Sequence, residues 1–373
     1  MAAGVYIHIP FCKSRCSYCD FATDIYRDPA WVERYVDALC REVGTARVSG
    51  RTDIDTIYFG GGTPSLLSPE QVEKILDAID LKLEISNNAE ITMEMNPATV
   101  TPETLAGYRR LGVNRASFGV QTFNDRALKL LARGHDANDA RNTFGMLRTA
   151  GFDNISLDLI AGLPGQAVAD WSNNLKETIA MRPEHLSLYL LEIHEGTPLA
   201  EQVRSGRQPT PDEEVAAEMY EVMLDRLAAA GYEQYEISNF SKPGYESRHN
   251  SKYWRMDHVY GFGVSAHSFD GRERYANERD TARYIEVIEQ ARTAEVMREE
   301  IDLASEFVFL GLRLEDGIDL GEYRDRFGHD LTSRYNGQLA ELVTADLVEG
   351  TADRLWLTRK GKLFSNEVFA VFV

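Results

Sequence analysis

Short runs of β-branched and apolar residues alternate with segments of helical periodicity through the first half of the chain. The runs predict strands at residues 5–9, 56–59, 90–95, 115–120, 154–159 and 185–191. Three of the helical segments start with a capping side chain followed by proline, at Asp28, Ser68 and Thr101, and two more helices are predicted at 125–133 and 138–150. Strands and helices in this order are typical of parallel βα units. We therefore predict an α/β fold with a partial (βα)6 barrel, short of the eight strands of a closed TIM barrel.

The alternation is lost beyond residue 195. A helix is predicted at 212–229, and residues 232–269 are rich in glycine and aromatic residues, as in loops that line a site. Helical patterns at 303–312, 320–327 and 331–345 then precede a predicted hairpin of 347–349 and 354–358, which together predict a small winged-helix-like α+β module. The predicted domains are the barrel (1–195), an irregular extension that completes the site (196–295) and the C-terminal module (296–373).

Composition and charge narrow the possible partners. The chain has 373 residues, 43% of them apolar, and a formal net charge of −19, so its long-range field repels phosphate. Residues 301–373 carry eight Lys and Arg against thirteen Asp and Glu, so the winged-helix-like module is not expected to bind DNA. We expect no nucleic-acid partner.

The distribution of apolar residues and cysteines predicts a cytoplasmic location. The sequence begins without a basic leader or an apolar signal segment, and it contains no apolar run long enough to span a bilayer. Its four cysteines include a cluster of three and no pair spaced as a disulfide framework, which fits a reducing compartment. Contact with a membrane is expected only through partners.

Three of the cysteines, Cys12, Cys16 and Cys19, follow the first predicted strand with the spacing C-x3-C-x2-C. Three thiolates this close cannot all pair in one disulfide, and iron–sulfur ligation is the favoured interpretation, because three cysteines on a four-iron cluster leave one iron open to a small molecule. Zinc is the alternative, although the sequence lacks the second ligand pair that a zinc site needs. Three unrelated core cysteines are the least favoured interpretation. Cys40, within a helical pattern, is expected to pack.

Glycine and polar residues follow several strands, at the end where parallel folds bind ligands. The run Gly-Gly-Gly-Thr-Pro at 60–64 is either a simple turn or a place where the backbone approaches the amino-acid part of a ligand, and its position beside the cysteines favours the ligand. Glu94 and Asp158 could accept from an amine or from ribose hydroxyls, or cap a helix. Arg133 could bind a carboxylate, or only complement a helix C-terminus.

A second candidate site is the sequence HNxxYW, which contains His249, Tyr253 and Trp254 and is predicted to lie in a loop. A histidine beside aromatic rings can ligate the iron of a porphyrin, or it can be an ordinary hydrogen-bonded histidine. Weaker candidates of the same kind are His8, His194, His258 and His267.

The cysteine motif resembles that of the radical S-adenosylmethionine (SAM) superfamily. Residues 6–12, 60–64, 118–121 and 158–165 resemble the branch of it that contains oxygen-independent coproporphyrinogen III dehydrogenase, and the resemblance runs nearly end to end. It implies the radical SAM type of partial barrel, with a [4Fe-4S] cluster on Cys12, Cys16 and Cys19 and SAM on the open iron. The residues that the resemblance assigns to the SAM site are Tyr6, Phe21, Gly61, Gly62, Thr63, Glu94, Gln121, Arg133 and Asp158.

Two features distinguish this sequence from the dehydrogenases. Only eleven residues precede Cys12, where those enzymes have a long extension, and Phe21 stands where they have another cysteine. The form C-x3-C-x2-C-x-F together with HNxxYW instead resembles the HemW family of heme chaperones, in which the HNxxYW element is associated with heme. The resemblance implies that His249 is the first candidate for a heme contact, with Tyr253 and Trp254 beside it.

These resemblances imply a heme chaperone that binds heme, a [4Fe-4S] cluster and SAM and delivers heme to respiratory-chain enzymes. A homodimer is plausible, no residue is assigned a catalytic role, and the scaffold is expected to lack dehydrogenase activity. The alternatives are an oxygen-independent coproporphyrinogen III dehydrogenase and a radical SAM methyltransferase. A winged-helix regulator is disfavoured by the acidic C-terminal module.

Overall fold

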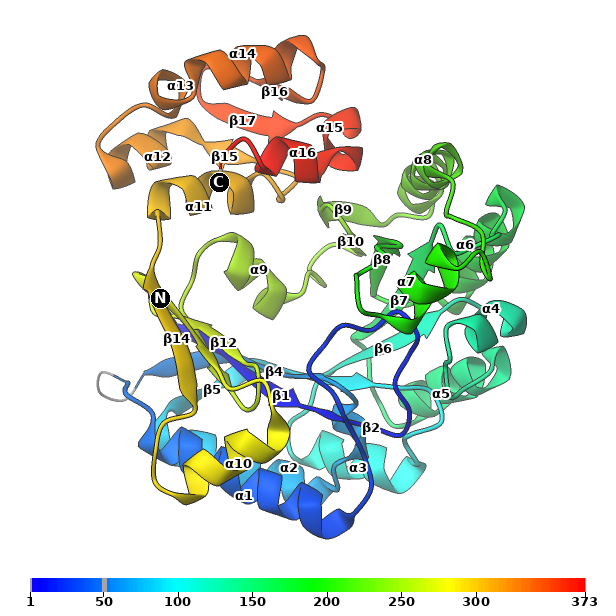
Figure 1. Cartoon of the computed structure of the whole chain (residues 1–373), viewed down its shortest axis with the longest axis vertical. Coiled ribbons are helices and arrows are strands. Elements are labelled where there is room, and N and C mark those ends of the chain that lie inside the picture. The colour runs from blue at the N-terminus through cyan, green and yellow to red at the C-terminus, as the bar shows by residue number, and fades with distance from the viewer. Residues whose placement is uncertain (1, 49–51, 373) are drawn as a thin grey trace.

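The computed structural model describes residues 2–48 and 52–372, which are built around a twelve-stranded sheet of order β14-β13-β12-β11-β1-β4-β5-β6-β7-β8-β10-β9 (Figure 1). Seven neighbouring strands run parallel. They are β11 (Val259–Phe262), β1 (Ala3–Ile9), β4 (Asp53–Gly61), β5 (Glu84–Met95), β6 (Arg115–Gln121), β7 (Ile155–Ala161) and β8 (His185–Leu190). The six predicted strands and the partial barrel are thereby confirmed.

Helices cover the outer face of the parallel strands (Figure 1). They are α1 (Pro29–Thr45), α2 (Pro69–Lys82), α3 (Pro102–Arg110), α4 (Asp125–Leu130), α5 (Ala137–Thr149) and α6 (Val168–Met181). The predicted starts are confirmed, because Asp28 caps α1 while Ser68 and Thr101 form capping boxes. The predicted helix at 125–133 ends early at Leu130, because Ala132 adopts a positive φ of 53° that a helix cannot continue through.

The main core lies between the parallel strands and these helices. All seven residues of β6 are buried, as expected for a central strand covered on both faces. The inner face is less apolar than the outer one, because Thr56, Thr92 and Arg115 are buried polar residues of neighbouring strands. The barrel interior is therefore a polar space enclosed by an apolar shell.

The segment 196–295, predicted as an irregular extension, contains regular elements, and the helix predicted within it at 212–229 is confirmed as α8. This segment adds strands to both edges of the sheet, because β10 pairs with β8 at one edge while β11 pairs with β1 at the other. Its elements besides β11 are α7 (Pro198–Arg204), α8 (Glu213–Ala229), β9 (Glu233–Glu236), β10 (Asn239–Ser241), α9 (Arg248–Trp254), β12 (His267–Phe269), β13 (Glu273–Asn277), α10 (Thr281–Glu289) and β14 (Glu295–Glu300). The segment thus crosses the barrel from one edge to the other, with α9 on the inner side (Figure 1). The domain boundaries themselves stay predictions.

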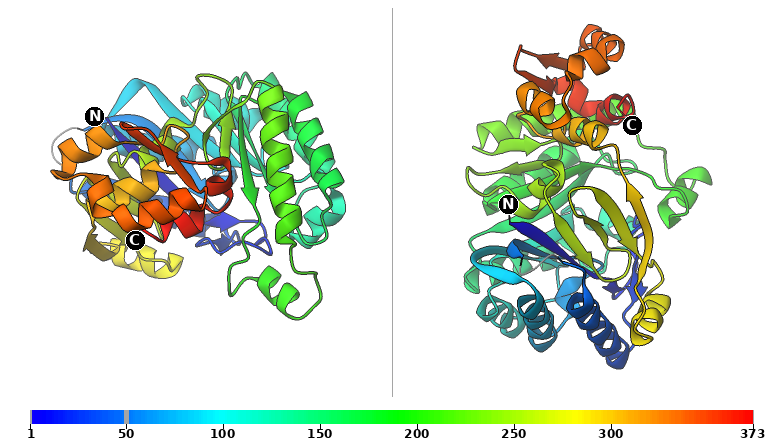
Figure 2. Two further views of the ribbon diagram at one scale, coloured as in Figure 1. Left: turned by 90° about the horizontal axis from the view of Figure 1, so that it is seen from above. Right: turned by 90° about the vertical axis from the view of Figure 1, so that its left-hand side faces the viewer.

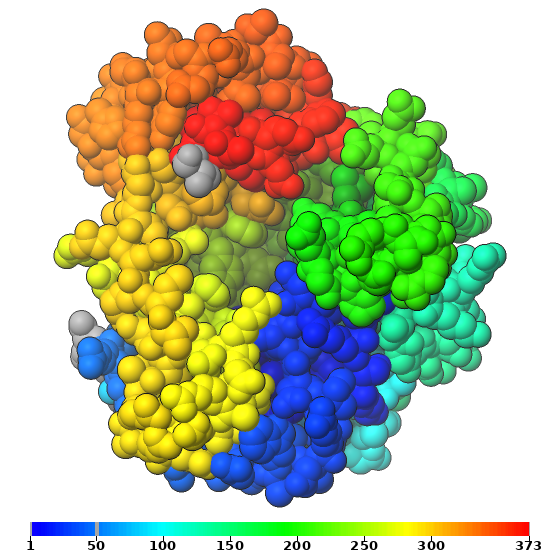
Figure 3. Space-filling view, viewed as in Figure 1, coloured from blue at the N-terminus to red at the C-terminus, as the bar shows by residue number. Residues whose placement is uncertain are grey.

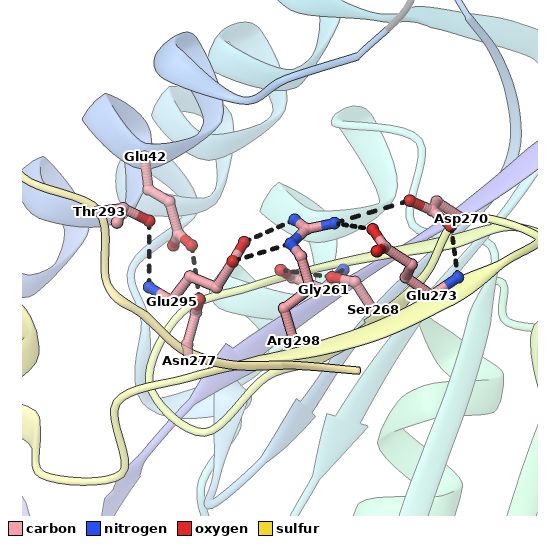
Figure 4. A network of polar contacts seen from close by, with 9 residues as sticks. All are labelled: Glu42, Gly261, Ser268, Asp270, Glu273, Asn277, Thr293, Glu295 and Arg298. Carbon is pink, nitrogen blue, oxygen red and sulfur yellow. Dashed lines mark hydrogen bonds and ion pairs between the residues drawn. The ribbon is translucent and has the colours of Figure 1, made fainter. Parts of the chain in front are cut away.

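The β14 edge of the sheet is fastened by ion pairs (Figure 4). Arg298 pairs with Glu295 at 2.7 Å on its own strand and with Glu273 at 2.8 Å on the neighbouring strand. Asn277 donates to Glu42 of α1 at 2.5 Å, and burial raises the pKa of this glutamate to about 7. The antiparallel edge is therefore tied to the first helix of the barrel.

The C-terminal module stands at one end of the barrel (Figure 2) and has its own apolar core. Its elements are α11 (Leu303–Gly311), β15 (Ile318–Asp319), α12 (Leu320–Phe327), α13 (Leu331–Arg334), α14 (Asn336–Thr344), β16 (Val348–Gly350), β17 (Arg354–Leu357), α15 (Arg359–Leu363) and α16 (Ser365–Phe369). The predicted hairpin is confirmed as β16 and β17, whereas the helix predicted at 331–345 is divided into α13 and α14.

Candidate functional site

The cysteine loop leaves the C-terminal end of β1 and is closed by two short parallel strands, β2 (Phe11–Cys12) and β3 (Asp24–Ile25). Cys12, Cys16 and Cys19 are free thiols. Burial raises the pKa of Cys12 to about 11, so a metal would have to displace its proton. Within the described residues, no group of three or more His, Cys, Asp or Glu side chains is arranged to hold a metal ion. The cluster assignment therefore rests on the motif and on the surroundings of the cysteines.

A chain of polar contacts joins two of the cysteines through the barrel. Arg133 donates from Nη1 to Cys16 Sγ at 3.4 Å and from Nη2 to Asn96 Oδ1 at 2.6 Å. Asn96 then donates to Thr63 Oγ1 at 2.8 Å, and the Thr63 hydroxyl donates to Cys12 Sγ at 3.6 Å. The Nε of Arg133 is buried and has no partner in the described part of the chain. One donor of this guanidinium is thus left for a ligand such as the predicted carboxylate.

The glycine turn after β4 packs closely against β1 and the cysteine loop. Gly61 has a φ of +109°, and a Cβ built on it would lie 2.6 Å from the His8 ring. A Cβ on Gly62 would lie 2.6 Å from the carbonyl oxygen of Pro10. Only glycine fits at these positions, and their backbone is accordingly free of side-chain cover.

The end of β6 has an irregular backbone. The pairing with β7 shifts register between Gly119 and Gln121, and the buried Gln121 has a φ of 65°, which is unusual for a residue with a Cβ. A Cβ on Gly119 would lie 2.5 Å from Gln121 Nε2 and 3.3 Å from Arg133 Nη2. The strand end therefore lets these two side chains lie close over Gly119, and strained residues of this kind are common at binding sites.

Two carboxylates lie inside the barrel. Glu94 accepts from the Tyr58 hydroxyl at 2.7 Å and from the Gly61 N–H at 3.1 Å, and burial raises its pKa to about 7. Burial also raises the pKa of Asp158 to about 6, although the positive charge of Arg115 opposes that shift. The Nε and Nη1 atoms of Arg115 are buried and have no partner among the described residues. The barrel interior therefore contains both acceptors and donors that the chain does not fully use.

Tyr6 and Phe21 are the remaining two residues predicted for the SAM site, and only Tyr6 has contacts inside the barrel. The Tyr6 hydroxyl hydrogen bonds with His8 Nδ1 at 3.1 Å, and its ring stacks on Tyr58 with 6.2 Å between the ring centres. Phe21 is 62% exposed at the surface of the cysteine loop. A role of Phe21 at the SAM site stays a prediction.

The HNxxYW element forms the short helix α9, so the prediction of a loop is wrong. Ser247 caps the helix, and the Glu90 carboxylate of β5 accepts the N–H groups of Arg248 at 3.3 Å and His249 at 3.2 Å. A carboxylate at a helix N-terminus stabilises the free N–H groups there. The helix is therefore formed through a contact with a strand distant in sequence.

His249 is enclosed by its neighbours. It is 1% exposed, its Nδ1 hydrogen bonds with Thr56 Oγ1 at 2.9 Å and its Nε2 with the Tyr253 hydroxyl at 3.1 Å. Burial and the positive charge of Lys252 lower the pKa of His249 to about 3, so the ring is neutral. Both ring nitrogens are used within the protein, and ligation of an iron requires that one of these bonds opens. The assignment of His249 as a heme contact stays a prediction.

A column of rings connects α9 with the strand that enters the cysteine loop. His249 stacks on Tyr58 with 5.2 Å between ring centres, Tyr58 stacks on Tyr6, and Tyr6 meets the His8 ring edge-on at 6.0 Å. The two candidate sites therefore share one barrel interior.

The other histidines and Trp254 lie apart from this column. His194 is 3.9 Å from the Asp20 carboxylate, and His258 and His267 are exposed. Trp254 lines a cavity between α9 and the C-terminal module. Of the weaker histidine candidates, only His8 belongs to the interior described above.

Interior residues that escaped sequence reasoning include Tyr58, Asn96 and Arg115. Arg115 carried a signal, because a charged residue that opens an otherwise apolar strand is rarely buried without a reason. Asn96 directly follows a predicted strand, at the end where ligands bind. Tyr58 carried no signal, because aromatic residues are ordinary in strands.

Two family models match the chain. The model of the radical SAM superfamily matches residues 6–177, which include the cysteine loop and the strands from β1 to β7. The model of the HemN C-terminal domain matches residues 299–364, most of the C-terminal module. The two matches correspond to the barrel and to the module at its end.

Curated relatives match over nearly the whole length. The heme chaperone HemW of Bacillus subtilis is 38% identical, over 99% of this chain and 99% of that protein. The heme chaperone HemW of Escherichia coli is 34% identical, over 99% of this chain and 98% of that protein. A bovine protein, radical S-adenosyl methionine domain-containing protein 1, mitochondrial, is 37% identical over 85% of this chain and 74% of its own.

The fold is also similar to that of a solved structure. The coproporphyrinogen III oxidase HemN of Escherichia coli superposes with a TM-score of 0.87, over 100% of this chain and 90% of that one. The sequence identity is 23%, so this likeness establishes the fold alone.

Proposed function

The chain belongs to the HemW family of the radical SAM superfamily, and from this membership we propose that it is a heme chaperone. It binds heme, holds a [4Fe-4S] cluster and SAM, and delivers heme to enzymes of the respiratory chain. The observation that carries the proposal is the 38% identity with the Bacillus subtilis heme chaperone over 99% of both chains.

The residues around the cysteine loop fit a cluster and SAM. Cys12, Cys16 and Cys19 are unpaired thiols and would hold the cluster, which can supply an electron to the sulfonium of SAM. Arg133, with its unused Nε, would bind the carboxylate of SAM. Glu94 would accept from the amine, since its pKa of about 7 lets it ionise near neutral pH.

The turn and the strand ends would complete the SAM site. Gly61, Gly62 and Thr63 leave their backbone groups uncovered for the methionyl part. Tyr6, Gln121, Asp158 and, at the surface, Phe21 are the further contacts that we propose.

His249, Tyr253 and Trp254 are the heme contacts that the family resemblance proposes. A neutral imidazole is the form that ligates iron, and the low pKa of His249 keeps its ring neutral. Ligation requires, however, that the ring gives up its bond to Thr56 or to Tyr253. A direct heme contact by His249 would therefore need α9 to open, whereas Trp254 of the same element already lines a cavity.

The same proposal covers the partners, the oligomeric state and the location of the protein. The partners are heme and heme-accepting respiratory enzymes, a homodimer is plausible, and no nucleic acid is involved. In the described part of the chain, no helix combines the length and the apolar character needed to cross a bilayer. A cytoplasmic location, with membrane contact only through partners, stays a prediction.

The alternative function is the oxidative decarboxylation of coproporphyrinogen III. The similarity to the HemN structure favours it at the level of the fold, but the 23% identity does not carry the reaction over. No observation favours the methyltransferase alternative over these two.

Both functions can be tested with one preparation. The cluster is reconstituted anaerobically, and the protein is titrated with heme while the Soret absorbance is followed. A second sample receives coproporphyrinogen III, SAM and a reductant, and its products are analysed by chromatography. We expect saturable heme binding and no protoporphyrinogen. Steady formation of vinyl groups would overturn the proposed function and support the dehydrogenase.

A further inference from the structure

A cavity of about 660 Å3 lies where α9 meets the C-terminal module. Residues of α9, of α11, of α16 and of the segments that follow α11 and α16 line it: Trp254, Phe309, Leu310, Arg313, Asn366, Phe369 and Ala370. Figure 3 shows a hollow on this face, below the red C-terminal helices, with the yellow-green segment that includes α9 at its back and the blue N-terminal segment on the opposite side. The volume lies within the range of about 300–1,000 Å3 that small-molecule sites occupy.

Arg313 carries the only charge among the described residues of this lining. Its guanidinium carbon lies 4.3 Å from the centre of the Trp254 ring and 5.7 Å from that of Phe369. Its ion-pair partner Glu236 is 3.6 Å away, beyond hydrogen-bonding distance. The Arg313 side chain keeps 26% of its surface exposed. A cation flanked by two rings suits an anionic group on a flat apolar body.

Two donors in this lining are not used. The Nε of Arg313 and the indole Nε1 of Trp254 are buried and have no acceptor in the described part of the chain. An unused buried donor is costly, and an acceptor that enters the cavity can reduce that cost once the side chains adjust. The cavity therefore combines an apolar surface with hydrogen-bond donors that lack acceptors.

A second cavity of about 350 Å3 provides a contrast within the same protein. Its lining includes the carboxylates of Asp225, Glu315 and Glu349. Its cations are already paired, since Arg359 contacts Asp225 at 3.0 Å and Lys362 contacts Glu315. An anionic ligand is repelled there and attracted at Arg313.

We propose that the cavity at Trp254 and Arg313 is the heme-binding cavity, with the porphyrin against the aromatic side chains and a propionate on Arg313. This inference rests on the proposed function and deepens it, because it places the porphyrin in a cavity lined by Trp254, one of the three proposed heme contacts. Heme is a flat apolar ring with two carboxylates. In a chain with a net charge of −19, the cation of an apolar cavity determines where those carboxylates bind.

The test compares two ligands and three variants of the full-length protein with its cluster reconstituted. The ligands are hemin and hemin dimethyl ester, which lacks the free carboxylates. The first variant, E236Q combined with R313Q, removes the charge of Arg313 without leaving Glu236 as an unpaired buried anion. The second variant, A370W, fills the cavity from an exposed position of its lining.

The third variant, R326Q, is the matched control. Arg326 also lies against two rings, 5.5 Å from Phe307 and 5.7 Å from Phe327, in the same module but outside the cavity. Circular dichroism and the cluster absorbance show whether each variant is folded. If the double variant does not fold, A370W alone decides.

We expect the double variant to bind hemin about tenfold more weakly or worse and to bind the diester as the wild type does. A370W should weaken the binding of both ligands, and R326Q should weaken neither. Saturable hemin binding that is unchanged in A370W and in the double variant would overturn this inference and leave the proposed function standing. The absence of saturable hemin binding in the wild type would instead overturn the proposed function.

Discussion

Arg133 at the cysteine end of the barrel interior and His249 at the α9 end differ in how far the chain satisfies their polar atoms. At the cysteine end, Arg133 has an unused buried donor, and burial raises the pKa of Glu94 to about 7. At the α9 end, both nitrogens of His249 are hydrogen-bonded, and Glu90 accepts the first N–H groups of the helix. The aromatic side chains between these two ends therefore connect a site with an unused donor, called the open end, to a site where both ring nitrogens of His249 are bonded, called the closed end.

This difference shows that a residue can belong to a binding motif without having a free group to bind a ligand. Buried groups without partners cost stability, and they persist where a ligand offsets that cost. The cysteine end therefore has the features of a site prepared for its ligand. In the HNxxYW element, His249 and Tyr253 instead hydrogen bond within the protein, while the indole N–H of Trp254 has no acceptor in the described part of the chain. The binding role of this element needs either an opening of α9 or the neighbouring cavity at Trp254.

The largest effect is expected from C12S, C16S or C19S, each of which removes one of the three thiols beside the open site. We expect each variant to lose the iron–sulfur absorbance after anaerobic reconstitution, because serine is a poor ligand for iron in such clusters. The control is C40S, since Cys40 lies on α1 and its thiol contacts only the Lys74 carbonyl, at 3.6 Å, among the hydrogen bonds of the described residues. A serine variant of the loop that retains a complete cluster would contradict the assignment.

The second effect tests whether the α9 end is closed for structural reasons. H249A leaves the hydroxyls of Thr56 and Tyr253 without a partner and removes a ring from the stack, so we expect the free energy of unfolding to fall by about 2–4 kcal/mol. Urea unfolding measures the change, and the exposed His258 supplies the control H258A, with an expected change within about 0.5 kcal/mol. If H249A is as stable as the wild type, the bonds of His249 do not stabilise the fold, and the α9 end is not closed for structural reasons.

The third effect concerns the backbone of the open end. A Cβ on Gly62 would meet the Pro10 carbonyl oxygen at 2.6 Å, and backbone atoms cannot move aside cheaply. We expect G62A to weaken SAM binding by about 1–3 kcal/mol, measured by calorimetry on the reconstituted protein. The matched control is G145A in α5, where a Cβ meets nothing within 4 Å and helix propensity favours alanine. Wild-type SAM affinity in G62A would show that the turn does not approach the ligand.

The sequence predicts those parts of the fold that local signals determine. Six strands, the capped starts of three helices and the C-terminal hairpin follow from alternation, capping residues and periodicity within a few residues. β11 could not be predicted in this way, because its parallel partner β1 is some 250 residues earlier in the chain. α9 was missed for the same reason, since Glu90 of β5 accepts the first N–H groups of the helix.

The candidate site shows the same division. The cysteines, the glycine turn and Glu94 stand at predicted strand ends, so topology alone brings them to one edge. The enclosure of His249 could not be predicted, because it depends on Thr56 from a strand that no local pattern connects with α9. The unused donors of Arg115 and Arg133 are also properties of the packed structure.

The smallest effect is a pH dependence that separates the two ends. Because burial raises the pKa of Glu94 to about 7, its carboxylate is mostly protonated at pH 6 and mostly ionised at pH 8. The ionised form accepts from the amine of SAM, so SAM affinity should rise roughly tenfold between these pH values in a calorimetric titration. E94Q should lose most of this rise, because Asp158, whose pKa is raised to about 6, is already half ionised at pH 6 and can add only about a twofold change.

The same group should affect stability in the opposite direction. A carboxyl with a raised pKa in the folded state contributes stability below its unfolded pKa and loses that contribution as the pH rises through about 7, so the SAM-free protein should become less stable where SAM binds better. His249, whose folded pKa is lowered to about 3, binds a proton near neutral pH only in the unfolded state, so its contribution to stability rises with pH and is the same in wild type and E94Q. Comparing wild type with E94Q in urea unfolding at pH 6 and pH 8 tests the sign. If the stability of wild type and of E94Q changes equally between pH 6 and pH 8, another group causes the change. The proposed titration of Glu94 would then be wrong.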